Sequence, residues 1–238
     1  MQLQPLAQYL LAENKSVLLL DACCLLDGIR GPARGRMADF EAAVAMAAAI
    51  DQGNLPFQIA LPSPVSVEAQ AHVADARGVV TTHLQQHDAT NQVFRRVHQA
   101  LGLPSPLPPV FPPLNTNPYE DFLEAIYWKI IKACHVIDDD PIFQQSARRR
   151  IAQGRRPGRR GSNKQFNDCR ILEESLALGA ELRQYRFKKR IVFGSSNIAD
   201  FSDAAKSIAH PDIAADLAPL HIEYAASLQE AHEAVLHP

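Results

Sequence analysis

The sequence has few cysteines and no spacing that would join them in a metal or disulfide site. The four are Cys23, Cys24, Cys134 and Cys169, and none belongs to a C-x-x-C pair. Neither a structural zinc site nor a disulfide framework is therefore indicated. We expect reduced and mostly buried thiols, as in a cytoplasmic protein.

Long apolar runs are also missing. No stretch reaches the roughly 18 apolar residues that a membrane span needs, and the amino-terminal segment lacks the basic and then apolar pattern of a secretory signal. The formal net charge is only −2, so overall charge does not mark a nucleic-acid-binding protein. These absences favour a cytoplasmic protein with no membrane partner.

Short apolar segments alternate with helical patterns along the chain. Runs of strand length occur in SVLLL (16–20), FQIALP (57–62), KKRIVFGSS (188–196) and the start of 221–236. Helical spacing is found at 3–14, 39–50, 67–102 with a break near Gly78, 119–137, and 166–185 with a start near Asn167 or Asp168. This alternation predicts an α/β protein in which a central parallel sheet has helices on both faces, giving three α/β/α layers.

The middle of the chain departs from this pattern. Residues 103–118 contain seven prolines, which exclude regular helix or sheet and predict an extended surface connection. We predict a single domain over residues 1–238, with a helical, proline-rich insertion at about residues 76–155.

Acidic and amide side chains stand near the ends of the predicted strands. Asp21 follows the first strand, Glu68 stands soon after the second, and Asn197 and Asp200 follow the strand in KKRIVFGSS. Asp168 lies in the helix before that strand. Because the carboxyl ends of parallel strands share one edge of a sheet, we expect these side chains to meet there.

A cluster of carboxylates repels itself and persists most easily around a cation. Carboxylate and amide oxygens without His or Cys suit Mg²⁺ or Mn²⁺ rather than zinc. One or two such ions would bind a scissile phosphate and lower the pKa of the attacking water. The candidate ligands and catalytic residues are Asp21, Glu68, Asp168 and Asp200, with Asn197 as an additional ligand.

Each candidate also has a simpler explanation when it is taken alone. Asp21 would serve as a helix cap, Glu68 would be a solvated helix residue, and Asp168 would be favoured near a helix start by the helix dipole. Asn197 and Asp200 would form an ordinary Asx turn. Only their convergence at one edge would distinguish a site from these local roles.

Two further acidic residues are given lesser roles. Asp27 precedes Gly28 and is expected in a turn. Glu173 is five residues beyond Asp168, a step that turns it away from the Asp168 face of the helix. Whether Glu173 joins the site stays open.

Four segments, in this order, resemble the PIN domain, a family of metal-dependent nucleases: LLLDACCLLD, PSPVSVEAQAHV, NKQFNDCRILEESLAL and IVFGSSNIADF. The family has an Asp ending its first strand, an acidic residue after the second, an Asp on a late helix and a final T/S-x-D/N-x-x-D-F segment. The matching positions are Asp21, Glu68, Asp168, Asn197 and Asp200, with Ser195 where the family has a hydroxyl.

The nearest subgroup is PIN-like and has a basic, Lys-bearing segment that leads into D-C-x-I-x-E-E. Here that segment holds Lys164, Asp168, Cys169, Glu173 and Glu174. The resemblance covers about residues 15–75 and 160–202. It implies a nuclease that uses Mg²⁺ or Mn²⁺ and leaves 5′-phosphate and 3′-hydroxyl ends. We favour an endoribonuclease, with RNA preferred to DNA as its substrate.

A basic segment precedes the late helix. Residues 148–164 hold eight basic residues and no acidic one. Placed just before Asp168, they would overhang the cleft, neutralise phosphates and make binding depend on salt. A solvated loop is the other explanation of such a run. The candidate substrate-binding residues are Arg155, Arg156, Arg159, Arg160, Lys164 and Ser195.

Other functions stay open. A non-catalytic PIN-like module would keep the cleft as a nucleic-acid-binding or protein scaffold, and a DNA nuclease would differ in substrate alone. Haloacid dehalogenase-type phosphatases also end a first strand in Asp, but they need a second Asp where this chain has Cys23. Some PIN-like proteins are toxins held by a small antitoxin, and others process RNA or act in defence. A small protein partner and a homodimer are thus both open.

Overall fold

The structure is a computed structural model that describes residues 1–102, 117–160, 163–203 and 208–237, with the backbone alone for residues 117, 160, 163 and 164. In these ranges the main elements follow in the order α1 (Leu3–Glu13), β1 (Ser16–Leu20), α2 (Ala22–Arg30), α3 (Met37–Asp51), β2 (Phe57–Leu61), α4 (Ser63–Ala100), α5 (Asn117–Ala133), β3 (His135–Val136), α6 (Pro141–Ala152), α7 (Asn163–Gln184), β4 (Ile191–Gly194), α8 (Ile198–Phe201), β5 (Ser202–Asp203), β6 (Ile208–Ala209), α9 (Pro211–Leu217), β7 (Ile222–Ala225) and α10 (Leu228–Leu236).

The central sheet has five parallel strands in the order β3–β2–β1–β4–β7. β1 lies in the middle, where Leu19 pairs with Ala60 of β2 and Leu20 pairs with Gly194 of β4. The chain first winds outward from β1 through β2 to β3, and then returns to build β4 and β7 on the other side. Such a reversal is a topological switch point, and ligand clefts of open α/β sheets form at the carboxyl ends of strands there. The predicted parallel α/β sheet is confirmed.

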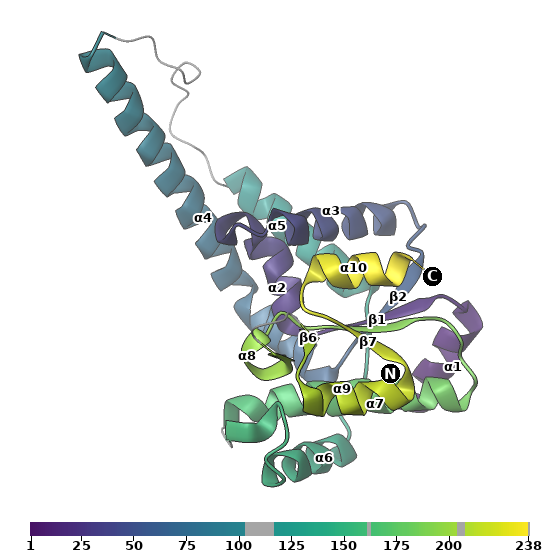
Figure 1. The fold of residues 1–238 in the computed structure, drawn as a ribbon. Coiled ribbons are helices and arrows are strands. Elements are labelled where there is room, and N and C mark those ends of the chain that lie inside the picture. Colours follow the sequence, from purple (N-terminus) through teal and green to yellow (C-terminus); the bar gives the residue numbers. More distant parts are fainter. Residues whose placement is uncertain (103–116, 161–162, 204–207, 238) are drawn as a thin grey trace.

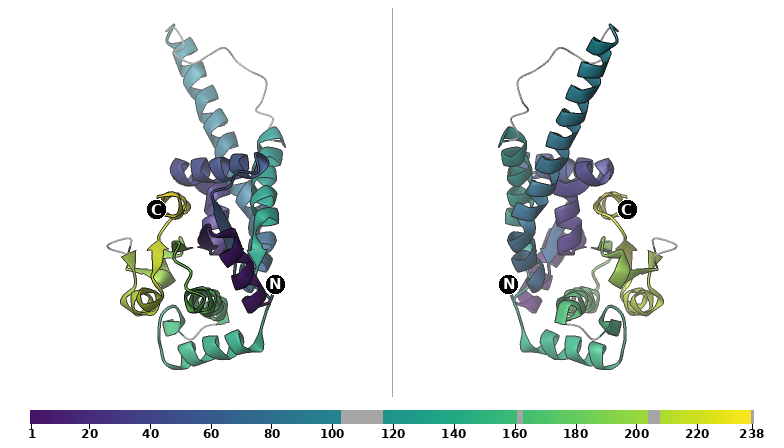
Figure 2. Two further views of the ribbon diagram at one scale, coloured as in Figure 1. Left: turned by 90° about the vertical axis from the view of Figure 1, so that its right-hand side faces the viewer. Right: turned by 90° about the vertical axis from the view of Figure 1, so that its left-hand side faces the viewer.

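Helices lie on both sides of this sheet (Figure 1), an arrangement compatible with three α/β/α layers. α3 and α10 lie on one side, and α7 and α9 lie on the other. The two side views in Figure 2 place α6 outside α7, farther from the sheet. In the described residues no helix combines the length and apolar composition that crossing a membrane requires.

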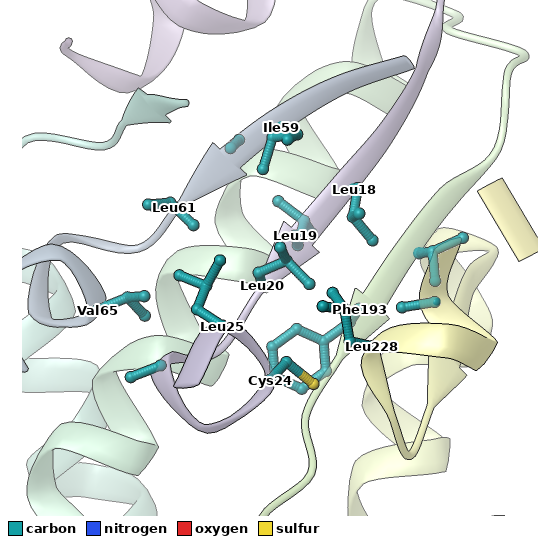
Figure 3. Packing of buried hydrophobic residues seen from close by; sticks show 14 of the residues in the cluster. Leu18, Leu19, Leu20, Cys24, Leu25, Ile59, Leu61, Val65, Phe193 and Leu228 are labelled. Carbon is teal, nitrogen blue, oxygen red and sulfur yellow. The ribbon is translucent and has the colours of Figure 1, made fainter. Parts of the chain in front are cut away.

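The core is densest around β1, whose residues Val17 to Leu20 are fully buried. Figure 3 shows Leu19 and Leu20 between side chains of neighbouring elements, including Leu25 of α2 and Leu228 of α10. Burying one such leucine contributes about 1.5–3 kcal/mol. Gly194 lets α10 approach, because a Cβ there would lie 3.0 Å from the Ala231 Cβ. A β1 that is apolar on both faces is what this covered position requires.

The predicted insertion is partly integrated into the domain. β3 lies within residues 76–155 and pairs with β2, so this stretch supplies an edge strand that periodicity did not reveal. A two-residue strand is too short to show a period. The proline-rich stretch 103–116 lies outside the described residues.

The helix after β2 differs from its prediction. It begins at Ser63 and continues unbroken past Gly78 to Ala100. Its buried residues end at Val80, and the remainder projects away from the sheet (Figure 1). A solvated helix tolerates one glycine at a cost of about 1 kcal/mol, which explains why Gly78 does not break it.

Candidate functional site

The site begins where β1 and β4 end side by side. The Asp21 N–H donates to the Gly194 carbonyl at 3.0 Å, which continues the ladder one residue past β1. The Ser195 hydroxyl donates to Asp21 Oδ2 at 2.7 Å. Both side chains are buried, with Asp21 1 % exposed and Ser195 fully covered. The residue after β1 and the residue after β4 are therefore joined at this edge of the sheet by a direct hydrogen bond.

Asp21 occupies the N-cap position of α2, but its side chain makes no capping hydrogen bond. Burial raises its pKa to about 6, and the charge of Glu68 adds to this rise. The hydrogen bond from Ser195 opposes the rise, as do the nearby N–H groups at the start of α2, in smaller measure. Asp21 is thus a buried carboxyl whose side-chain hydrogen bond comes from the residue after β4 and not from the first turn of α2.

A cleft of about 900 Å³ opens beside this pair. Four of the five predicted site residues line it: Glu68, Asp168, Asn197 and Asp200. Asp21 lies beneath the lining and interacts electrostatically with Glu68 and Asp168. The other lining residues are Cys23, Ser63, Pro64, Val67, Ala71, His72, Asp139, Gln165, Asn167 and Arg170.

Asn197 stands between two of the carboxylates. Its Nδ2 lies 3.3 Å from Asp200 Oδ2 and 3.5 Å from Asp168 Oδ1, donating to both. The second oxygen of Asp200 accepts from Gln165 Nε2 at 2.8 Å. Amide N–H groups thus provide the partial positive charge that separates these two carboxylates in the present arrangement.

Asp168 is the most perturbed of the site carboxyls that the structure describes. Its pKa is raised to about 8, mainly by burial and in smaller measure by the negative charges of Asp21, Asp200 and Glu68. The hydrogen bond from Asn197 opposes them. α7 begins at Asn163, so Asp168 lies inside the helix rather than at its predicted start. Asp168 is therefore beyond the first turn of α7, where a helix dipole acts most strongly.

Two further buried carboxylates, Asp27 and Glu174, were not predicted to belong to the site but hold together the segments that carry it. Asp27 belongs to α2 rather than to a turn, and it accepts hydrogen bonds from Ser196 Oγ at 2.7 Å and from three arginines. The bond to Ser196 ties α2 to the segment that bears Ser195 and Asn197. A signal for this was present in GIRGPARGR, whose Arg30, Arg34 and Arg36 are the three donors.

The second is Glu174, which is fully buried on α7. Its carboxylate accepts from the Ser63 N–H at 2.5 Å and from the Ser63 hydroxyl at 2.7 Å. This fastens the beginning of α4, and so the helix that carries Glu68, to the helix that carries Asp168. Burial raises the pKa of Glu174. Glu173 instead pairs with Arg150 at 2.5 Å and is not among the residues that line the cleft.

The predicted substrate-binding residues have diverse surroundings. Arg155 pairs with Asp216 at 2.6 Å, and Arg156 donates to the Ala199 carbonyl and lies 3.7 Å from Asp200. Arg159 is exposed. Ser195 is buried against Asp21, so its hydroxyl positions a carboxylate instead of facing the cleft. The side chains of Arg160 and Lys164 lie outside the described residues.

The cleft suits a hard cation by the chemistry of its donors, which are carboxylate and amide oxygens. Among the described residues, however, no three His, Cys, Asp or Glu side chains are already gathered at ligand distance. Asn197 would have to turn its amide over to present Oδ1 in place of Nδ2. Binding would therefore draw these side chains together.

The four cysteines are all free, two of them buried and two half-buried.

Comparisons of the chain with protein-family models, with curated proteins and with solved structures give no match. The fold and the cleft thus rest on this chain's own residues, and the PIN-like resemblance stays a prediction from the sequence.

Proposed function

We propose that this protein is a metal-dependent nuclease that hydrolyses phosphodiester bonds, with RNA as its favoured substrate. One observation carries the proposal: Glu68, Asp168, Asn197 and Asp200 line one cleft at the switch point of a parallel sheet, and the buried Asp21 interacts with Glu68 and Asp168, so that five residues meet there. These residues come from four separate segments of the chain, and local structure alone gives no reason for them to meet.

In this proposal Asp21, Glu68, Asp168 and Asp200 hold one or two Mg²⁺ or Mn²⁺ ions, and Asn197 supports one of them. A bound ion would neutralise the phosphate and lower the pKa of the attacking water. Ser195 keeps Asp21 oriented through its hydrogen bond. Glu174 keeps α4 and α7 in register, so that Glu68 and Asp168 face the same space.

The basic segment contributes unequally to substrate binding. Arg155 already pairs with Asp216, whereas Arg159 is exposed and available to a phosphate. We expect Arg159 to contribute more than Arg155 to the salt dependence of binding.

The test compares the purified protein with its Asp21→Asn variant on single-stranded RNA and single-stranded DNA, with Mn²⁺ and with EDTA. We expect cleavage of RNA that needs Mn²⁺ and is lost in the variant. Asp51→Asn is the matched control, because Asp51 is an exposed carboxylate paired with Lys129 at the end of α3. Equal cleavage by the Asp21→Asn variant and the original protein would contradict the assignment.

The same experiment separates the other functions. A non-catalytic scaffold would bind RNA without Mn²⁺, would not cleave it, and would tolerate Asp21→Asn. A DNA nuclease would prefer the DNA strand. The experiment does not distinguish a toxin from a processing or defence enzyme, for which an antitoxin-like partner would have to be found.

A further inference from the structure

The cleft of the proposed nuclease has more acidic than basic side chains in its lining, which disfavours the binding of a phosphate. Its lining includes the acidic residues Glu68, Asp139, Asp168 and Asp200, and each of them repels a phosphodiester when it is ionised. Among the described residues that line the cleft, Arg170 is the one with a permanent positive charge. Arg170 belongs to α7, two residues after Asp168, and was not among the residues predicted to bind substrate.

Two contacts fix the guanidinium of Arg170 to α4 and α7, one with Ser63 and one with Glu174. One of its terminal nitrogens, Nη2, lies 2.7 Å from the Ser63 hydroxyl and 3.3 Å from Glu174 Oε1. Glu174 is fully buried and is itself fixed by the Ser63 N–H. Separating a buried carboxylate from its cation is costly, so this anchor stays in place.

The third partner of Arg170 is different. Asp139 Oδ1 accepts from the same Nη2 at 2.6 Å, and the Asp139 side chain is 51 % exposed. Solvent can replace the protein contacts of such a half-exposed carboxylate, so Asp139 is the partner that Arg170 can exchange most easily. In addition, the buried Nε of Arg170 has no hydrogen-bond partner in the part of the chain that the structure describes. Because this Nε is buried, the donor that can be exchanged is the terminal Nη2 N–H that now faces Asp139.

We propose that Arg170 is a phosphate-binding residue of this cleft, and that a substrate phosphate replaces Asp139 on its guanidinium. The forked N–H groups of arginine match a phosphate, and charge-assisted bonds of this kind are the stronger ones. Glu174 and Ser63 keep the guanidinium in place while Asp139 is displaced. Asp139 then acts as an internal competitor that occupies the subsite when no nucleic acid is bound. This inference rests on the proposed nuclease function, because the phosphate is that of the nucleic-acid substrate.

The test is binding of a fluorophore-labelled, mixed-sequence single-stranded RNA to the full chain, in EDTA and at low salt, followed by fluorescence anisotropy. Asp139→Asn should bind the RNA about twofold to fivefold more tightly, because it removes the competitor. The matched control is Asp140→Asn, which has the same charge change one residue away. Asp140 caps α6 by accepting from the Ile142 N–H, a role that asparagine also fills.

Arg170→Gln should weaken binding about tenfold, while its amide can still donate to Glu174. Combining Arg170→Gln with Asp139→Asn should abolish the gain that Asp139→Asn gives alone, since the two residues act through one contact. Thermal unfolding of each variant verifies that it is folded. If Arg170→Gln does not fold, the comparison of Asp139→Asn with Asp140→Asn still decides.

A merely structural Arg170–Asp139 pair gives a different result. Asp139→Asn and Asp140→Asn would then change RNA affinity equally, or the gain from Asp139→Asn would persist without Arg170, and either outcome overturns the subsite alone. If the original protein neither binds nor cleaves RNA or single-stranded DNA, the proposed function fails, and the subsite fails with it.

Discussion

The Ser195 hydroxyl donates a 2.7 Å hydrogen bond to Asp21 Oδ2, and so joins the residue after β4 to the residue after β1 across 174 positions of sequence. Both groups are buried. A buried carboxylate needs such a donor, because burial disfavours its charged form. Ser195 therefore orients Asp21 and counteracts part of the rise in its pKa that burial causes.

Replacing this donor should affect catalysis before it affects folding. Ser195→Ala leaves Asp21 without its side-chain donor, and so the pKa of Asp21 rises above its value of about 6. We expect nuclease activity to fall about tenfold to a hundredfold, as for other partners of metal ligands. The acidic limb of the activity-against-pH profile should also move to higher pH. The control is Ser175→Ala, a buried serine whose hydroxyl donates to the Ile171 carbonyl of its own helix. An unchanged pH profile would show that Ser195 does not act through Asp21.

Metal binding should stabilise the protein through the same carboxylates. A ligand that binds only the folded state adds about 2.7 kcal/mol when its concentration is a hundred times its Kd. We expect Mn²⁺ to raise the melting temperature of the original protein and of Asp51→Asn. Asp21→Asn should lose most of this rise. Equal Mn²⁺ stabilisation of all three proteins would place the ion elsewhere.

Asp168 should make the metal-free protein less stable as pH rises. Its pKa is about 8 in the folded protein and 3.8 as its ordinary value, so the folded state holds the proton over a range in which the unfolded state has released it. The free energy of unfolding therefore decreases between about pH 4 and pH 8.

The variant that tests this is Asp168→Asn, which removes the ionisable group. In EDTA it should be more stable than the original protein at pH 8 by at least about 1 kcal/mol, given about 1.4 kcal/mol for each unit of pKa shift. The difference should shrink toward pH 4. Urea unfolding at several pH values measures it, and a difference that does not vary with pH would contradict the assigned pKa.

Glu174 should be a stabilising residue, since it fastens α7 to the start of α4. Glu174→Gln replaces a charged acceptor of two hydrogen bonds from Ser63 with a neutral one. We expect a loss of about 2 kcal/mol in the free energy of unfolding, measured in urea. The matched control is Glu223→Gln, an exposed residue paired with Arg190, which should change stability by less than about 0.5 kcal/mol. Equal effects of the two substitutions would mean that the Ser63 contacts are not worth more than a surface pair.

Some of this site could be predicted from the sequence because the signals are local. An apolar run that closes on Asp21 marks a covered strand with a polar end, and parallel strands bring their carboxyl ends to one edge. From those two facts Glu68, Asp168, Asn197 and Asp200 could be expected to meet, and all four line one cleft. The short edge strand β3 could not be predicted, because two residues carry no period.

Periodicity along the chain was thus enough to predict β1, β2, β4 and β7, most of the long helices, and the acidic residues near the strand ends, but not α2, β3 or α6. Only the tertiary structure decided which charges are neutralised and by what. It paired Arg155 with Asp216, buried Glu174 against Ser63, and left Arg170 beside the cleft with an exposed partner. Such pairings join residues that are distant in sequence, and they depend on the distances and burial that packing alone creates.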